Sequence, residues 1–82
     1  MSLFFLEYDL RKKRDYQSLY DELARFAAVR YLESAWAFKR VNTTAAGLRN
    51  HFAQFIDPDD GLMVIEVSDW AGRSLDGDPN KL

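Results

Sequence analysis

The sequence predicts an α+β domain in which a four-stranded antiparallel sheet carries two helices on one face. Runs of aromatic and branched residues that favour strands occupy the start of the chain, its middle and residues 62–67. Two segments with apolar residues at helical spacing separate these runs. Because the middle run is long enough for two strands, the order is β-α-β-β-α-β. Such a split repeat closes into a ferredoxin-like sandwich, with the first strand central and beside the last.

The first strand is predicted at residues 3–10, before any turn signal. Because side chains alternate along a strand, one of its faces is apolar apart from one phenol hydroxyl, and consists of Phe4, Leu6, Tyr8 and Leu10. The other face starts with Leu3 and Phe5 and ends with Glu7 and Asp9. We expect the first face to lie under the helices and the second to be the helix-free face of the sheet.

Two amphipathic helices are predicted. The first follows Asp15, a suitable N-cap, and its apolar stripe consists of Tyr16, Leu19, Tyr20, Leu23, Phe26 and Ala27. The second follows Asn42-Thr43-Thr44, any of which can cap it, and its stripe consists of Ala45, Leu48, Phe52, Phe55 and Ile56. His51 flanks this stripe. Since the chain has no second histidine and no cysteine, we expect His51 to be packed or half-exposed rather than catalytic.

Residues 28–41 are predicted to form two strands, at 28–32 and 35–40, that fold back near Glu33-Ser34. A single bent strand is the alternative, because the turn lacks Asn-Gly or Asp-Gly. Trp36 and Phe38 share one face and are expected in the core or an interface. In the last strand, residues 62–67, we expect Leu62, Val64 and Glu66 to lie on the helix-free face.

Residues 1–70 are expected to form a single domain, followed by a polar C-terminal tail at residues 71–82. The tail is rich in polar residues, glycine and proline, so we expect it to be loose. Trp70 and Leu75 are the exceptions, and they are candidates for pairing with an edge strand of this subunit or of a partner.

Composition restricts the class of protein. A chain of 82 residues buries only about 60–65% of its unfolded surface, and without cysteine it has no disulfide or zinc thiolate to support it. Its 15% aromatic content therefore favours a core shared in a homodimer. No apolar run approaches the ~20 residues of a membrane helix, and no signal peptide is recognisable, so we expect a cytoplasmic protein that does not contact membranes. The net charge of −2 gives no global attraction to nucleic acid.

The candidate site lies where the first strand ends. Asp9 is followed by four cations, Arg11, Lys12, Lys13 and Arg14, which form either a solvated loop or a set of phosphate contacts. Asp9 itself either pairs with Arg11 or Arg30, or ligates a metal at a subunit interface. Carboxylates that share a sheet face repel one another. Glu7, Asp9 and Glu66 therefore need solvent, cations or a bridging metal.

Three segments resemble a known family. Tyr8-Asp9-Leu10 resembles the Tyr-Asp-Ile/Leu signature of the second CRISPR-associated protein family, which is similar to the virulence-associated protein D group. Arg30, followed by Ser34-Ala35-Trp36, resembles the Arg-x-x-x-Ser-Val-Phe segment of that family. Residues 60–65 resemble its acidic turn before the last strand. Leu32 stands where relatives often carry glutamine, and the hairpin lacks the family's glycine.

This resemblance implies a homodimer formed across the sheets and last strands, in which Asp9 of each subunit contributes to a Mg²⁺ site. The implied activity is that of a metal-dependent endonuclease acting on RNA or DNA, with Asp9 as catalytic and metal-binding residue. The candidates for nucleic-acid contact are Arg11, Lys12, Lys13, Arg14 and Arg30, and Tyr8 and Ser34 are the family-motif residues. The alternative is a non-catalytic homodimer that binds nucleic acid or protein.

Overall fold

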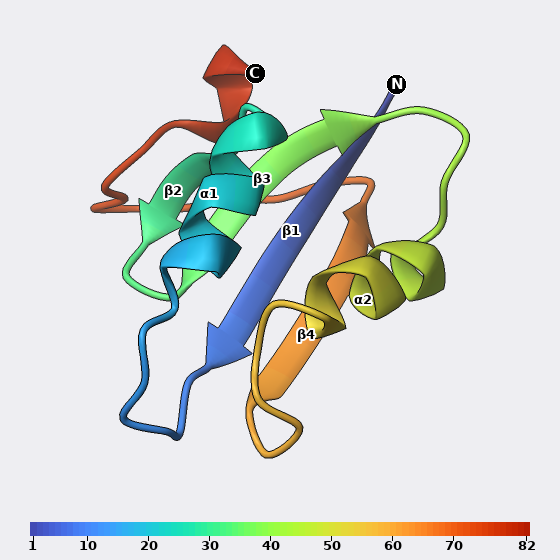
Figure 1. Ribbon diagram of the computed structural model, residues 1–82. Coiled ribbons are helices and arrows are strands. Elements are labelled where there is room, and N and C mark those ends of the chain that lie inside the picture. Colours follow the sequence, from blue (N-terminus) through green and yellow to red (C-terminus); the bar gives the residue numbers. More distant parts are fainter.

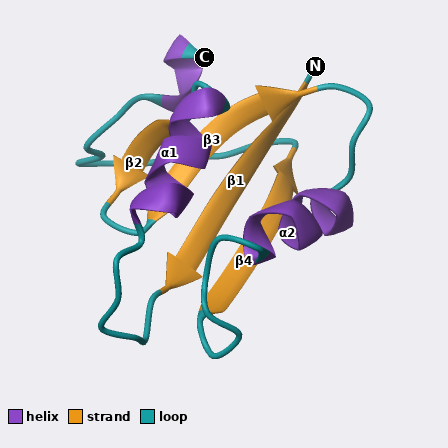
Figure 2. Cartoon of the chain, in the orientation of Figure 1, coloured by secondary structure: helices purple, strands orange, loops and turns teal.

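The strands and helices follow the predicted order in a computed structural model that describes residues 1–82 (Figure 1). The elements are β1 (Ser2–Asp9), α1 (Gln17–Arg25), β2 (Val29–Leu32), β3 (Ala35–Arg40), α2 (Ala45–Ala53), β4 (Gly61–Val67) and a 3₁₀ turn at Pro79–Lys81. The sheet order is β2-β3-β1-β4 and every neighbouring pair is antiparallel. Both helices cover the same face of the sheet (Figure 2). The predicted ferredoxin-like α+β fold is therefore confirmed.

The core lies between the helices and one face of β1. Phe4 and Leu6 are fully buried there, whereas Glu7 and Asp9 on the opposite face are exposed, as the alternation predicts. The helices contribute Leu19, Leu23, Leu48 and Phe52 to the same apolar cluster. No helix is long and apolar enough to cross a membrane.

The ends of both helices follow local chemistry. Thr44 caps α2, since its hydroxyl accepts a hydrogen bond from the Gly47 amide at 3.1 Å. The prediction of Asp15 as the N-cap of α1 is wrong by one residue, because Tyr16 occupies the cap position; the Asp15 carboxylate still accepts from the Gln17 amide at 2.8 Å. Helix α1 ends in a Schellman motif, in which the Ala28 amide donates to the Leu23 carbonyl and Ala27 adopts a φ of 54°.

Residues 28–41 form a hairpin and not one bent strand. Strands β2 and β3 pair antiparallel and turn at Glu33-Ser34, as predicted. Trp36 and Phe38 lie on the helix-covered face, opposite Leu6 and Phe4 of β1.

The predicted faces of β4 are wrong. The antiparallel register places Leu62, Val64 and Glu66 opposite Tyr8, Leu6 and Phe4, on the helix-covered face. Met63 and Ile65 lie on the helix-free face instead, opposite Glu7 and Phe5. Both alternating sets of β4 are largely apolar, so its pattern does not reveal its face; the pairing of Gly61 with Asp9 sets it. Glu66 is therefore separated by the sheet from Glu7 and Asp9.

The expectation of a loose C-terminal tail is also wrong. After β4 the chain crosses behind the sheet to β2 and ends near the N-terminus (Figure 1). Trp70 packs edge-on against Phe5, with ring centroids 6.2 Å apart, and the Asp76 amide donates to the Tyr31 carbonyl at 2.9 Å. Leu75 and Leu82 pack on a second apolar cluster at Tyr31, Ala35 and Ala37. Trp70, Leu75 and Leu82 thus hold the otherwise polar tail against the helix-free face of the sheet.

Candidate functional site

Asp9 ends β1 at the rim of the sheet, where it pairs with Gly61 of β4. Its carboxylate forms an ion pair with Arg11, with Nε 3.1 Å from Oδ2. The Asp9 side chain is 73% exposed and that of Arg11 56% exposed. The structure thus contains the ion pair that the sequence offered as one alternative, in a position where solvent screens it strongly.

The turn at residues 57–60 neutralises part of the basic loop. The Arg11 amide donates to Asp60 Oδ1 at 2.7 Å, and its guanidinium donates to the Asp59 carbonyl at 2.8 Å. Lys12 Nζ lies 2.9 Å from Asp59 Oδ2. Lys13 and Arg14 take part in none of the ion pairs of the chain. These two cations of the loop are therefore the candidates for contact with an external anion, although the Arg14 guanidinium lies over the Tyr16 ring, 5.1 Å from its centroid.

The Asp60 carboxylate connects the basic loop to the turn at residues 57–60 through hydrogen bonds. Its carboxylate also accepts hydrogen bonds from the Tyr16 hydroxyl at 2.7 Å and from the Asp57 amide at 2.8 Å. Partial burial raises the pKa of Asp60, but the hydrogen bonds from Arg11, Tyr16 and Asp57 outweigh it and lower that pKa below its usual value. Asp60 is thus an ionised structural residue that fixes where the basic loop lies.

The residues of one chain do not fit a Mg²⁺ site. No group of three or more histidine, aspartate or glutamate side chains is arranged to hold a metal ion. Mg²⁺ requires near-octahedral oxygen ligands, and Asp9 supplies one carboxylate that Arg11 already occupies. Glu7, the nearest carboxylate on the same face, accepts a hydrogen bond from the Tyr31 hydroxyl at 3.3 Å. Burial, with the charge of Glu7, raises the pKa of Tyr31 to about 12.

Arg30 does not join the basic loop. Its guanidinium lies over the rings of Tyr20 and Trp36, 5.5 and 5.2 Å from their centroids, and donates to the Glu33 carbonyl at 2.8 Å. It also reaches the Tyr8 hydroxyl at 3.4 Å. These contacts hold Arg30 at the end of the hairpin. In this position Arg30 does not pair with Asp9.

The two other motif residues meet through the backbone. The Tyr8 amide donates to the Ser34 carbonyl at 3.1 Å, where the hairpin turn adjoins β1. The Tyr8 hydroxyl accepts a hydrogen bond from Trp36 Nε1 at 3.0 Å under the helices. Both residues therefore anchor the hairpin to the central strand.

A contact between Glu22 of α1 and His51 of α2 was not predicted from the sequence. Glu22 of α1 is 7% exposed, and its carboxylate lies 2.6 Å from His51 Nε2 of α2 and 3.0 Å from Arg25. His51 packs among the rings of Phe26, Phe52 and Phe55, which agrees with its predicted packed position. The available signal was the position of Glu22, three residues after Leu19 and four before Phe26, inside the apolar stripe.

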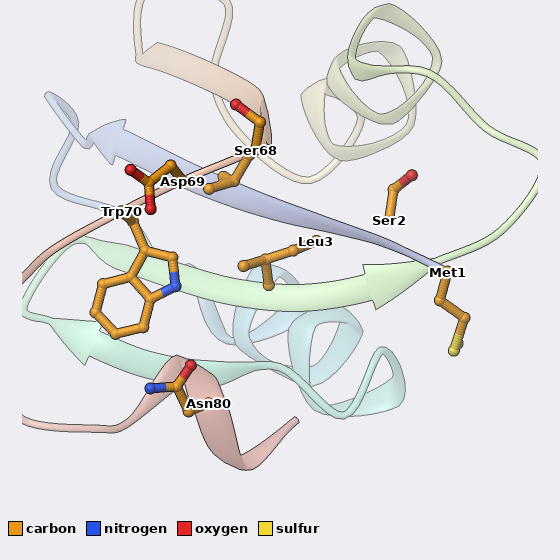
Figure 3. Close-up of a pocket in the computed structure, with 8 residues that line it drawn as sticks. Met1, Ser2, Leu3, Ser68, Asp69, Trp70 and Asn80 are labelled. Atoms are coloured by element: carbon orange, nitrogen blue, oxygen red, sulfur yellow. The ribbon is translucent and has the colours of Figure 1, made fainter.

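A hollow of about 580 Å³ opens where the tail leaves β4 (Figure 3). Leu3, Trp70 and Asn80 line it, together with Ser68 and Asp69. Its only ionisable side chain is that of Asp69. Met1 also lines the hollow, so the amine of this residue is the other ionisable group there.

No protein-family model matches the chain, and no solved structure matches it significantly. The resemblance to the second CRISPR-associated protein family stays a prediction from the three quoted segments.

Proposed function

We propose that this chain is a non-catalytic, homodimeric scaffold that binds nucleic acid, assembled by pairing β4 with the β4 of a second copy. The observation that carries the proposal is the unprotected edge of the sheet at β4. An edge strand presents unpaired backbone amides and carbonyls, and proteins usually shorten, bend, charge or cover such an edge.

The two edges of this sheet differ in that respect. Strand β2 has four residues, carries a register shift between Arg30 and Leu32, and bonds to the tail at Tyr31. Strand β4 has seven residues, contains no proline, pairs with β1 without a shift and has Glu66 as its single charge. Met63 and Ile65, both exposed on its helix-free face, add apolar surface. The features that protect β2 are missing from β4.

Two β4 strands that pair antiparallel about Val64 bring their exposed apolar side chains together. A two-fold axis at Val64 places Met63 opposite Ile65 of the partner subunit, so two apolar pairs form on the helix-free face. Because directly opposed residues share a face, both pairs remove side chains from water that one chain leaves exposed. The tail covers the face over β2 and β3, so it does not obstruct this edge.

This arrangement separates the two Asp9 carboxylates. Asp9 pairs with Gly61, three residues from the proposed axis, and its mate lies equally far on the other side. At ~3.3 Å per residue the two carboxylates are roughly 20 Å apart along the strands, too far to share one ion. The proposed dimer is therefore a binding protein and not a two-aspartate metal enzyme.

The nucleic-acid contacts in this proposal come from Lys13 and Arg14, the loop cations without an ion pair. Binding of single-stranded oligonucleotide should weaken with salt, with a slope of about −0.7 per neutralised phosphate. We expect the double variant Lys13→Gln/Arg14→Gln to flatten this slope by roughly two contacts per chain. The control is Arg49→Gln/Arg73→Gln, which removes two exposed cations elsewhere. Equal effects of both double variants would assign the binding to overall charge.

A second candidate function is the metal-dependent endonuclease that the resemblance implies. The observation that favours it is the exposure of Asp9 at the end of a central strand. It requires a different dimer, in which the helix-free faces meet and bring both Asp9 side chains together. Cleavage of RNA or DNA that needs Mg²⁺ or Mn²⁺ and disappears in Asp9→Asn would support this function. Wild-type protein that binds but does not cleave with either metal supports the scaffold.

A further inference from the structure

A second basic site lies at the end of the sheet opposite the 11–14 loop. Arg40 ends β3 beside Ser2, at the start of β1, whereas Asp9 and the loop lie at the other end of β1 (Figure 1). A hollow of about 440 Å³ opens there between the end of α1, the end of β3 and the last residues of the chain. Its lining includes Phe26, Val29, Leu82 and three cations, Lys39, Arg40 and Lys81.

The cations of this hollow have no aspartate or glutamate partner. None of the three takes part in an ion pair, and no aspartate or glutamate side chain lines the hollow. Lys39 Nζ donates at 3.2 Å to a backbone oxygen of Leu82, the last residue of the chain, so its ammonium is held at the hollow and already has an acceptor there. In a chain with a net charge of −2, three cations around one hollow, of which Arg40 and Lys81 have no acceptor, form a local departure from the overall balance.

Arg40 is oriented for anion recognition. Its guanidinium lies over the Phe26 ring, with Cζ 3.8 Å from the centroid. A guanidinium in this position is held by the ring while the N–H groups in its plane stay available, so less rotational freedom is lost when it binds. Its planar fork matches two oxygens of a phosphate group.

We propose that Arg40, Lys39 and Lys81 form a binding site for a phosphate group. Arg40 supplies two parallel hydrogen bonds, and Lys81, with Lys39, adds positive charge. The phosphate belongs either to a free polyphosphate or to a nucleic-acid backbone. The site is complete within one chain, so it depends neither on the β4 dimer nor on the 11–14 loop.

The test is a calorimetric titration of the full chain with inorganic pyrophosphate at low salt. We expect saturable binding that Arg40→Gln weakens at least about tenfold, the effect of losing hydrogen bonds to a charged group. The control Arg49→Gln removes the same charge from an arginine on α2 whose side chain bonds only to Asn50, and it should leave binding unchanged. Lys81→Gln, at an exposed position, should weaken binding several-fold without affecting the fold.

Competition identifies the source of the phosphate. An oligothymidylate that displaces pyrophosphate from the wild type, and is itself weakened by Arg40→Gln, indicates a nucleic-acid backbone; pyrophosphate binding without competition indicates a free polyphosphate. Absence of saturable pyrophosphate binding, or equal losses in Arg40→Gln and Arg49→Gln, overturns the site. A dimer-disrupting variant such as Met63→Lys should bind pyrophosphate normally, so failure of the scaffold proposal and failure of this one are distinguishable.

Discussion

At the scale of single residues, the end of α1 contains a strained alanine. Ala27 adopts a φ of 54°, which costs an L-residue with a Cβ roughly 1–2 kcal/mol, whereas glycine adopts it freely. We expect Ala27→Gly to raise the free energy of unfolding by about 1 kcal/mol in urea denaturation. Ala24→Gly, at an exposed position within α1, should lower it by a similar amount. A loss of stability in both variants would mean that the strain at Ala27 is already relieved.

Tyr31 makes a second prediction at this scale. Burial and the charge of Glu7 raise its pKa to about 12, above the value near 10 of an unfolded chain. The neutral phenol therefore stabilises the fold below pH 10, and this contribution is lost as the pH rises from 10 to 12. Unfolding midpoints measured across this range should fall, and Tyr31→Phe should reduce the fall. An unchanged pH dependence in the variant would contradict the influence of burial and of Glu7 on Tyr31.

In the basic loop, the sequence predicts the local contact but not the long-range contacts. Asp9 and Arg11 are two residues apart, so their pairing was among the predicted alternatives, and the structure contains it. Arg11 and Lys12 bind Asp59 and Asp60 across 47–49 positions of sequence, a proximity that exists only once β4 has paired with β1. A run of cations alone therefore overstated the positive charge that this loop offers.

At the scale of elements, periodicity predicted the helices and strands, which depend on one segment each. It did not predict features that depend on how two segments pack together. The strands, the helices and the hairpin appear where alternation and helical spacing placed them. The faces of β4 depend on its register with β1, which a strand that is apolar on both sides does not encode by itself. The tail docks through Trp70, Leu75 and Pro79, too few apolar positions to form a periodic pattern.

The same two elements define how copies of the chain can meet. The docked tail covers the helix-free face over β2 and β3. At the uncovered β4 edge, the exposed large apolar side chains are Met63 and Ile65. With the register as observed, Leu62 and Val64 belong to the helix-covered core and are not available to a partner. This restriction is the reason for proposing an edge-to-edge dimer.

At the scale of the whole molecule, the proposed dimer is a continuous sheet of eight strands with a basic loop and an Arg40 hollow at each end. Because the two-fold axis reverses the strands, the loop of one copy lies at the same end as the hollow of the other. Phosphate contacts are then distributed along two opposite rims, which suits a scaffold that holds an extended strand.

Sedimentation of the wild type and of a designed pair of β4 substitutions tests this dimer most directly. At tens of micromolar the wild type should sediment at twice the 9.5 kDa mass of one chain. Met63→Lys should give a monomer, and Met63→Lys/Ile65→Glu should restore the dimer, because each new lysine then faces a glutamate of the partner. Val41→Lys, another exposed apolar residue, is the control and should leave the dimer intact. A wild type that sediments only at 9.5 kDa, or a dimer that Met63→Lys leaves unchanged, would contradict assembly through β4.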